Sequence, residues 1–242
     1  MKLSVQLYTL RDPLGDDFEG TLSAVKEIGL EYVELAGDLG RSAQEWRETL
    51  DRLGLKASGA HIGLALLDED LDKVIADAKT IGFKYVIVPW VGTEDYNGGW
   101  TAFGKRLAPL GEKLAAAGLA LCYHNHDFEY KNGDGMTELY ASVPPSVLQA
   151  EIDAAWVKIG GYDPIATVSA LKGRLPLVHL KDFDPDKTPR WVPAGAGVMP
   201  MVELIAAAKE AGAEFGVIEL DESPGAPLDA VKASFEYLSD KV

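Results

Sequence analysis

The stretch Thr80–Val88, TIGFKYVIV, contains the junction that decides the fold, because a helical segment ends there and a strand begins. Upstream of it, the residues Val74, Ile75, Ala78 and Ile81 fit one face of a helix. Gly82 suits the position after a helix, because glycine adopts the left-handed backbone conformation without a Cβ clash. The run that follows is rich in β-branched and aromatic residues, which is typical of a strand.

The same helix–glycine–strand junction recurs five more times along the chain. The other junctions read EIGLEYVEL (27–35), RLGLKASGA (52–60), AAGLALCYH (116–124), LKGRLPLVHL (171–180) and EAGAEFGVI (210–218). Two further strands lack the glycine: LSVQLY opens the chain, and VLQAEID follows Pro144 and Pro145, which would stop a preceding helix. The sequence therefore predicts eight strands.

Strands that alternate with helices indicate parallel pairing and right-handed crossovers. Eight such units in 242 residues predict a (β/α)8 TIM barrel, with residues 1–242 forming a single domain. The alternative is an open doubly wound sheet, which usually carries a glycine-rich phosphate turn after its first strand. The corresponding segment here, YTLRDPLGD (8–16), has no such motif.

Composition limits the classes of function. Hydrophobic residues make up 47% of the chain and the formal net charge is −15, which opposes binding to a nucleic-acid backbone. No apolar run approaches the ~18–20 residues of a membrane span. The N-terminus lacks a signal-peptide pattern, so we expect a cytoplasmic protein. The lone cysteine, Cys122, allows no disulfide within the chain and is expected in the core.

Titratable residues gather at the predicted carboxyl ends of the strands, which form the active face of a TIM barrel. All four histidines lie there: His61, His124, His126 and His179. The acids at these ends are Glu34, Glu129, Glu151, Asp153, Asp182, Glu219 and Asp221. Burying so many carboxylates without compensation is costly, and a divalent cation is the simplest compensation. Taken singly, each has a structural alternative; Asp153, for example, would cap the following helix.

A site of carboxylates with one imidazole suits Mn²⁺ or Mg²⁺, and leaves Co²⁺, Fe²⁺ and Zn²⁺ as further options. The single cysteine excludes a cysteine-based structural zinc site. We therefore expect one divalent metal ion at the barrel mouth.

Six motifs resemble the sugar-phosphate isomerase/epimerase-like family, also called xylose-isomerase-like TIM barrels. They are QLYTLRD, YVELAG, HNHDFEY, EIDAAWVKIGG, VHLKD and VIELD, and they cover nearly the whole chain. The resemblance to the ketose-epimerase branch implies one metal held by four residues from strands five to eight. Matched by motif, these ligands are Glu129, Asp153, His179 and Glu219, with Glu151 as the alternative on the sixth strand.

The resemblance also implies substrate contacts at the mouth. We expect these from His61, His126, Lys181, Trp90, Trp156, Tyr8 and Glu34. Core packing is the alternative for the aromatic residues, and an ion pair with Asp182 is the alternative for Lys181. The chain departs from the epimerase pattern at Trp156, where those enzymes often carry a histidine. Their arginine after strand seven has no clear match, because Pro185 takes that offset and Arg190 lies further on.

These features imply a metal-dependent isomerase or epimerase that acts on a keto-sugar through an enediolate, with Glu129 and Glu219 as the acid/base pair. Expulsion of a β-substituent from the same enediolate would instead make the enzyme a lyase or dehydratase. The acidity and the four histidines disfavour an endonuclease-IV-like nuclease. A noncatalytic barrel would be expected to lose some of the ligands. The turn AGAG (194–197) is a weak candidate phosphate cradle, and a homo-oligomer remains open.

Overall fold

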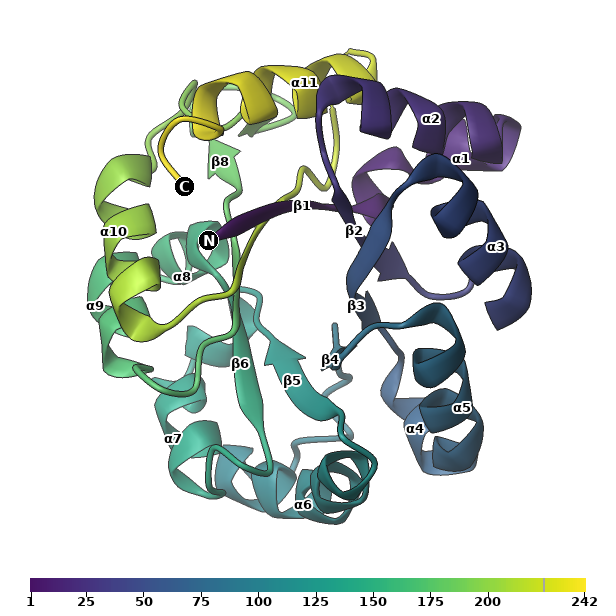
Figure 1. The fold of residues 1–242 in the computed structure, drawn as a ribbon. Coiled ribbons are helices and arrows are strands. Elements are labelled where there is room, and N and C mark those ends of the chain that lie inside the picture. The colour runs from purple at the N-terminus through teal and green to yellow at the C-terminus, as the bar shows by residue number, and fades with distance from the viewer. Residues whose placement is uncertain (224) are drawn as a thin grey trace.

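The computed structural model describes residues 1–223 and 225–242, and these residues form a closed parallel barrel. The strands follow the order β1-β10-β7-β6-β5-β4-β3-β2, with helices arranged around them (Figure 1). Their bounds are β1 Lys2–Gln6, β2 Tyr32–Ala36, β3 Lys56–His61, β4 Tyr85–Val88, β5 Ala120–His124, β6 Gln149–Asp153, β7 Leu177–His179 and β10 Phe215–Ile218. The predicted TIM barrel is confirmed.

The helices of the described residues follow these strands along the chain, the last of them after β10. They are α1 Arg11–Asp16, α2 Phe18–Ile28, α3 Ala43–Leu53, α4 Leu64–Glu69, α5 Leu71–Ile81, α6 Trp100–Ala116, α7 Gly135–Ala141, α8 Ala154–Ile159, α9 Pro164–Ala170, α10 Met201–Ala211 and α11 Pro227–Leu238. Two short 3-10 helices, η1 Leu7–Leu10 and η2 Phe128–Tyr130, follow β1 and β5. Within the described ranges, no helix combines the length and apolar character needed to cross a bilayer.

The junction glycines behave as their sequence context predicts. All six have a positive φ. Gly82, for example, has φ 94° and its N–H donates to the Ala78 carbonyl oxygen at 2.8 Å, which closes α5 before β4. Such a backbone is strained for residues with a Cβ, so glycine ends the helix and turns the chain into the next strand.

One element was not predicted, a short antiparallel hairpin after β7 formed by β8 Asp182–Phe183 and β9 Trp191–Val192. The buried Asp182 carboxylate organises the loop around it. It accepts hydrogen bonds of 2.8–3.0 Å from four backbone N–H groups, those of Phe183, Gly195, Gly197 and Met199. Two of these groups belong to the AGAG turn.

The barrel lumen is apolar near the amino ends of its strands. Six buried residues form a compact cluster there: Tyr85, Ile87, Cys122, Leu177, Phe215 and Val217. Because side chains alternate along a strand, residues two positions further along β7 and β10 also face the lumen, nearer the mouth. These positions hold His179 and Glu219, so the side chains that face the lumen change from apolar to polar or charged within two residues along the chain. Cys122 is a core residue, as expected.

Candidate active site

A cavity of about 680 Å³ lies over the carboxyl ends of the strands. Six predicted site residues line it: Tyr8, His61, Trp90, His126, Trp156 and Glu219. Four further side chains with polar or aromatic character also line it: His124, Trp191, Asp221 and Glu222. Its size falls within the range of small-molecule sites, which are lined by aromatic groups and a few convergent polar groups.

At the floor of this cavity, potential metal ligands converge from consecutive strands. One ligand atom from each of four buried residues lies within 4.8 Å of the others, and the four are His124, Asp153, His179 and Glu219. They come from β5, from β6, from β7 and from the residue that follows β10. Three of the four predicted metal ligands are therefore brought together, with His124 in the place expected for Glu129.

Glu129 itself lies on η2, outside this group. Its carboxylate accepts one hydrogen bond from the Tyr123 hydroxyl and one from the His126 backbone N–H, both at 2.9 Å. Burial raises the pKa of Glu129 to about 7. β5 ends at His124 and Glu129 follows on η2, where its carboxylate holds the segment after β5 through these two hydrogen bonds.

Asp153 serves two functions at the end of β6. Its Oδ1 accepts hydrogen bonds from the backbone N–H groups of Ala155 and Trp156 at 3.0 Å, which caps α8. Its buried Oδ2 lies 2.9 Å from Lys181 Nζ but has no hydrogen bond of acceptable geometry. Asn125 fixes the backbone of Asp153 by hydrogen-bonding both its N–H and its carbonyl oxygen. The contact that holds Oδ2 is therefore the ion pair with Lys181.

Lys181 is a buried ammonium surrounded by carboxylates. Its Nζ lies 2.9 Å from oxygens of three acids, Asp153, Glu219 and Asp221. Burial alone would lower the pKa of Lys181, but these negative charges outweigh it and raise the pKa. The alternative ion pair with Asp182 is not formed, because Asp182 binds backbone N–H groups.

A second group of potential ligands lies beside the first and shares His124 and His179 with it; its other members are His61 and Glu151. Glu151 Oε2 lies 2.7 Å from His61 Nε2 and 3.1 Å from His124 Nδ1. Glu34 does not line the cavity; its Oε2 accepts from Gln6 and lies 3.2 Å from His61 Nε2. Burial alone would lower the pKa of His61, but Glu151 and Glu34 raise it to about 9.

Aromatic side chains form the rim of the cavity. Trp90 is 59% exposed and Tyr8 is 45% exposed, although both are large apolar groups. Trp156 packs between His126 and Trp191, with ring centroids 5.5 and 4.9 Å away. Burial lowers the pKa of His126 to about 4, so its imidazole is neutral near pH 7.

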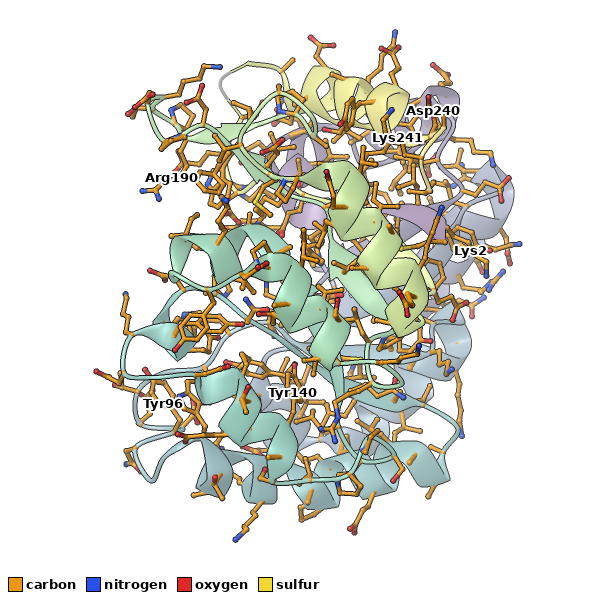
Figure 2. The ribbon with its side chains drawn as sticks, turned by 90° about the vertical axis from the view of Figure 1, so that its left-hand side faces the viewer. Lys2, Tyr96, Tyr140, Arg190, Asp240 and Lys241 are labelled. Atoms are coloured by element: carbon orange, nitrogen blue, oxygen red, sulfur yellow. The ribbon has the colours of Figure 1, made fainter. Side chains whose placement is uncertain are left out.

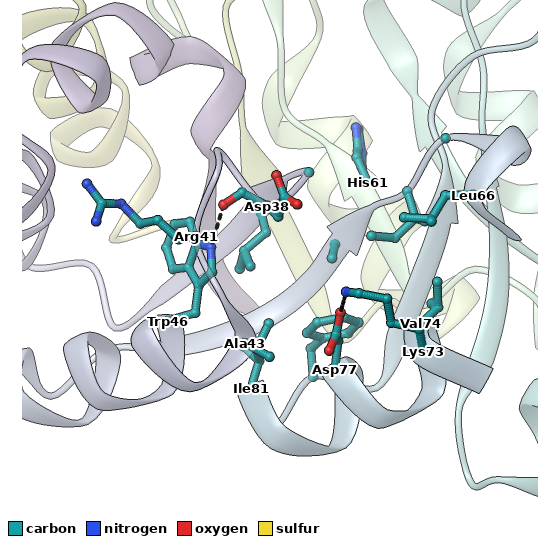
Figure 3. Close-up of a pocket in the computed structure, with 16 residues that line it drawn as sticks. Asp38, Arg41, Ala43, Trp46, His61, Leu66, Lys73, Val74, Asp77 and Ile81 are labelled. Carbon is teal, nitrogen blue, oxygen red and sulfur yellow. Dashed lines mark hydrogen bonds and ion pairs between the residues drawn. The ribbon is translucent and has the colours of Figure 1, made fainter. Parts of the chain in front are cut away.

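A smaller cavity of about 200 Å³ lies between α3 and α5 (Figure 3). It meets the mouth cavity at Gly37, His61 and Gly63, which line both. Two of its charged groups, Lys73 and Asp77, pair with each other, as the dashed line in Figure 3 marks. The Arg41 guanidinium lies 3.7 Å from the centroid of the Phe18 ring. Among the described residues, His61 is the one potential metal ligand that it shares with the groups above, so the mouth cavity is the candidate active site.

Comparison with known proteins agrees with this architecture. The rhizopine catabolism protein MocC of Rhizobium meliloti is 24% identical over 196 residues, which cover 72% of this chain and 60% of that protein's length. A sugar phosphate isomerase/epimerase from Parabacteroides distasonis has a TM-score of 0.88 at 20% identity, over 98% of this chain and 93% of that one. The probable 3-DHS dehydratase AsbF from Bacillus anthracis has a TM-score of 0.78 at 17% identity, over the full length of both chains.

The family model described as xylose isomerase-like TIM barrel matches residues 22–241, which is most of the chain. The match includes seven of the eight barrel strands and all the potential metal ligands described above. The chain therefore belongs to the xylose isomerase-like TIM barrel family.

Proposed function

We propose that this protein is a divalent-metal-dependent isomerase or epimerase that moves a proton beside the carbonyl of a keto-sugar or sugar derivative. The observation that carries the proposal is the convergence of His124, Asp153, His179 and Glu219 at the floor of the mouth cavity. The names of the structural neighbours, which include an isomerase/epimerase and a dehydratase, are consistent with enolate chemistry.

The residues present fit a metal ion. The donors are buried, and Asp153 Oδ2 has no hydrogen-bond partner in the structure. With His124 in place of Glu129, the site has two imidazoles and two carboxylates, which favours Mn²⁺, Fe²⁺, Co²⁺ or Zn²⁺ over Mg²⁺. A bound divalent ion would supply a Lewis acid that polarises the substrate carbonyl and stabilises negative charge on its oxygen.

Glu219 is the proposed base, because it both lines the cavity and belongs to the ligand group. Its Oε2 lies 2.7 Å from His179 Nδ1 and 2.9 Å from Lys181 Nζ, so both residues orient the carboxylate and stabilise its charged form. General-base assistance of this kind typically contributes ~10²–10⁴-fold to the rate.

His61 is the proposed second proton-handling group. It lines the cavity on β3, three strands away from β10 around the barrel, and thus faces the substrate from another side. Glu151, at 2.7 Å, orients the ring and compensates its charge. The alternative is that Glu129 is the second proton-handling group, as its motif implies. The variants His61→Gln and Glu129→Gln distinguish the two assignments.

The test is metal-dependent deuterium exchange in D2O, followed by NMR with keto-sugars, inososes and 3-keto-glycosides as substrates. We expect exchange at the carbon beside the carbonyl with Mn²⁺ present, and loss of more than ~10²-fold in Glu219→Gln. Glu203→Gln, on the exposed face of α10, is the matched control and should behave as wild type.

A larger loss in His61→Gln than in Glu129→Gln supports the assignment of His61, and the reverse order supports Glu129. Release of water or an alcohol would identify elimination, and hence a lyase, after the same proton removal. Absence of divalent-metal binding, or of exchange with every class of substrate, would refute the proposed function.

A further inference from the structure

Away from the metal ion of the proposed function, the side-chain charges that line the mouth cavity are unsuited to an anionic group of a substrate. Among the described residues that line it are three acids, Glu219, Asp221 and Glu222, and three imidazoles. Of the imidazoles, His61 is already paired with carboxylates, because oxygens of Glu151 and Glu34 lie 2.7 and 3.2 Å from its Nε2. Phosphate and carboxylate groups are normally recognised by Arg or Lys, which supply hydrogen bonds and opposite charge. The net charge of −15 adds a repulsive background field.

Lys181 is the ammonium group that forms ion pairs with the acids at the floor of the cavity, and these ion pairs already balance its charge. Three carboxylates lie 2.9 Å from its Nζ, and the residue is 1% exposed. The rings of Trp156 and Trp191 lie 5.7 and 4.9 Å from the same atom. A substrate anion could reach Lys181 only by displacing a carboxylate, and it would then face the two that remain.

Neither of the two arginines near the mouth places its guanidinium in the lining of the cavity. Arg190 is exposed, and Figure 2 shows its side chain extending from the outer edge of the molecule. Arg11 donates a hydrogen bond to the Tyr8 carbonyl oxygen and lies 4.2 Å from the centroid of the Tyr8 ring. Neither residue lines the cavity.

The turn AGAG, a possible phosphate cradle by sequence, already holds an anion of the protein itself. The N–H groups of Gly195 and Gly197 donate to Asp182 Oδ2 at 2.9 and 3.0 Å. Backbone N–H groups of this kind are what a phosphate would bind. Because the Asp182 carboxylate consumes them, the turn offers these groups to no substrate.

The same mouth suits the neutral surface of a sugar ring. Trp90 and Tyr8 are exposed aromatic side chains at the rim, against which the apolar C–H face of a sugar ring can pack. The carboxylates are acceptors for hydroxyl groups, and His126 retains an unpartnered buried Nδ1. Building on the proposed function, we infer that the substrate is an uncharged ring sugar rather than a sugar phosphate or a sugar acid.

The first test measures binding, so it does not depend on turnover. Mn²⁺-loaded protein is titrated by calorimetry with matched pairs, namely D-fructose with D-fructose 6-phosphate and methyl 3-keto-glucoside with its 6-phosphate. We expect the neutral member of at least one pair to bind tenfold or more tightly at low salt, and the gap to narrow at 1 M salt. Tighter binding of the phosphorylated members, or no binding of either neutral sugar, would overturn the inference.

The second test reverses one charge at the rim. Glu222 is exposed and lines the cavity, so Glu222→Lys should improve the affinity for the phosphorylated probe relative to the neutral one about fivefold. Glu27→Lys is the matched control, because Glu27 is exposed and lies two residues before the glycine that leads into β2, at the opposite end of the barrel. An unchanged ratio in Glu222→Lys, or an equal change in both variants, would contradict the inference.

A third measurement tests anion exclusion without any sugar. Trp90 fluorescence, isolated as the difference between wild type and Trp90→Phe, is quenched with iodide, caesium and neutral acrylamide. We expect iodide to quench less than caesium relative to acrylamide, with iodide quenching restored in Glu222→Lys. Preferential quenching by iodide would overturn the inference, even if the deuterium-exchange experiment had confirmed the proposed function.

Discussion

The two ends of the barrel are built from the same strands, yet their lumen side chains have opposite properties. On β7, Leu177 belongs to the apolar cluster, whereas His179 two residues later lies among carboxylates. At the mouth, four buried carboxylate oxygens lack hydrogen-bond partners: Glu34 Oε1, Glu151 Oε1, Asp153 Oδ2 and Asp221 Oδ2. Since buried polar groups are normally satisfied, this concentration of exceptions marks the end that binds a ligand.

From this difference we infer that the residues at the amino ends of the strands mainly stabilise the fold and that the residues at the mouth bind the ligand. The largest effect that tests it is expected for Phe215→Ala. Phe215 is buried in the apolar cluster and packs edge-to-face on Tyr32 and Tyr85, with ring centroids 5.1 and 6.4 Å away. Removing the ring should cost ~3–5 kcal/mol in urea unfolding while leaving Mn²⁺ affinity unchanged.

Val202→Ala, on the exposed face of α10, is the control for Phe215→Ala and should change stability little. If Phe215→Ala weakened Mn²⁺ binding as strongly as it weakened folding, the two ends of the barrel would be energetically coupled. That result would contradict the separation of stability from ligand binding.

The second prediction concerns the mouth. Mn²⁺ at 100 times its Kd should raise the free energy of unfolding by about 2.7 kcal/mol, because the ion binds the folded state alone. The same gain is expected in Phe215→Ala, measured at equal saturation. In Asp153→Asn the gain should largely disappear, since that change replaces one of the two carboxylates among the four converging donors by a neutral amide. A stabilisation that survives in Asp153→Asn would place the ion elsewhere.

Asn125 tests the distinction between the two ends, because it lies at the mouth but supports the backbone of a neighbouring residue. Its side chain bonds the backbone N–H and carbonyl oxygen of Asp153 and is fully buried. Asn125→Ala leaves these backbone groups unpaired, so we expect a loss of ~2 kcal/mol in unfolding free energy together with weaker Mn²⁺ binding. Asn97→Ala, at an exposed loop position, is the control. Loss of stability with unchanged metal affinity would show that Asp153 does not need this support.

The predictable part of the molecule is the part that repeats. The junction glycines and strand periodicity place His61, Asp153, His179 and Glu219 at strand ends, because a TIM barrel brings such ends to one mouth. Glu129 lies outside the group of converging donors, and nothing in HNHDFEY shows that β5 stops at His124. The hairpin β8–β9 has strands of two residues, too short for a periodic signal, so Trp191 was not anticipated at the cavity. The three partners of Lys181 come from the end of β6 and from the segment after β10, so they could be identified only from the closed barrel.

The smallest effect is expected at the amino end, where an exposed network stands in contrast to the buried charges of the mouth. Glu214 accepts hydrogen bonds from the Tyr85 hydroxyl and from Lys2, at 2.9 and 3.1 Å. Burial alone would raise the pKa of Glu214, but these partners outweigh it and lower the pKa below its ordinary value near 4.5. A carboxylate with a lowered folded-state pKa stabilises the fold above that ordinary value, and the contribution is lost as pH falls through the folded pKa.

Glu214→Gln should therefore lower the unfolding free energy by ~0.5 kcal/mol at pH 7, a modest amount because the pair is solvent-exposed. The difference from wild type should shrink as the pH falls below 4.5, and Mn²⁺ affinity should be unaffected at every pH. Urea titrations of both proteins between pH 3 and 7 measure the difference directly. A gap that widened in acid would reverse the sign of the linkage, and a change in metal affinity would show that charge at this end reaches the mouth.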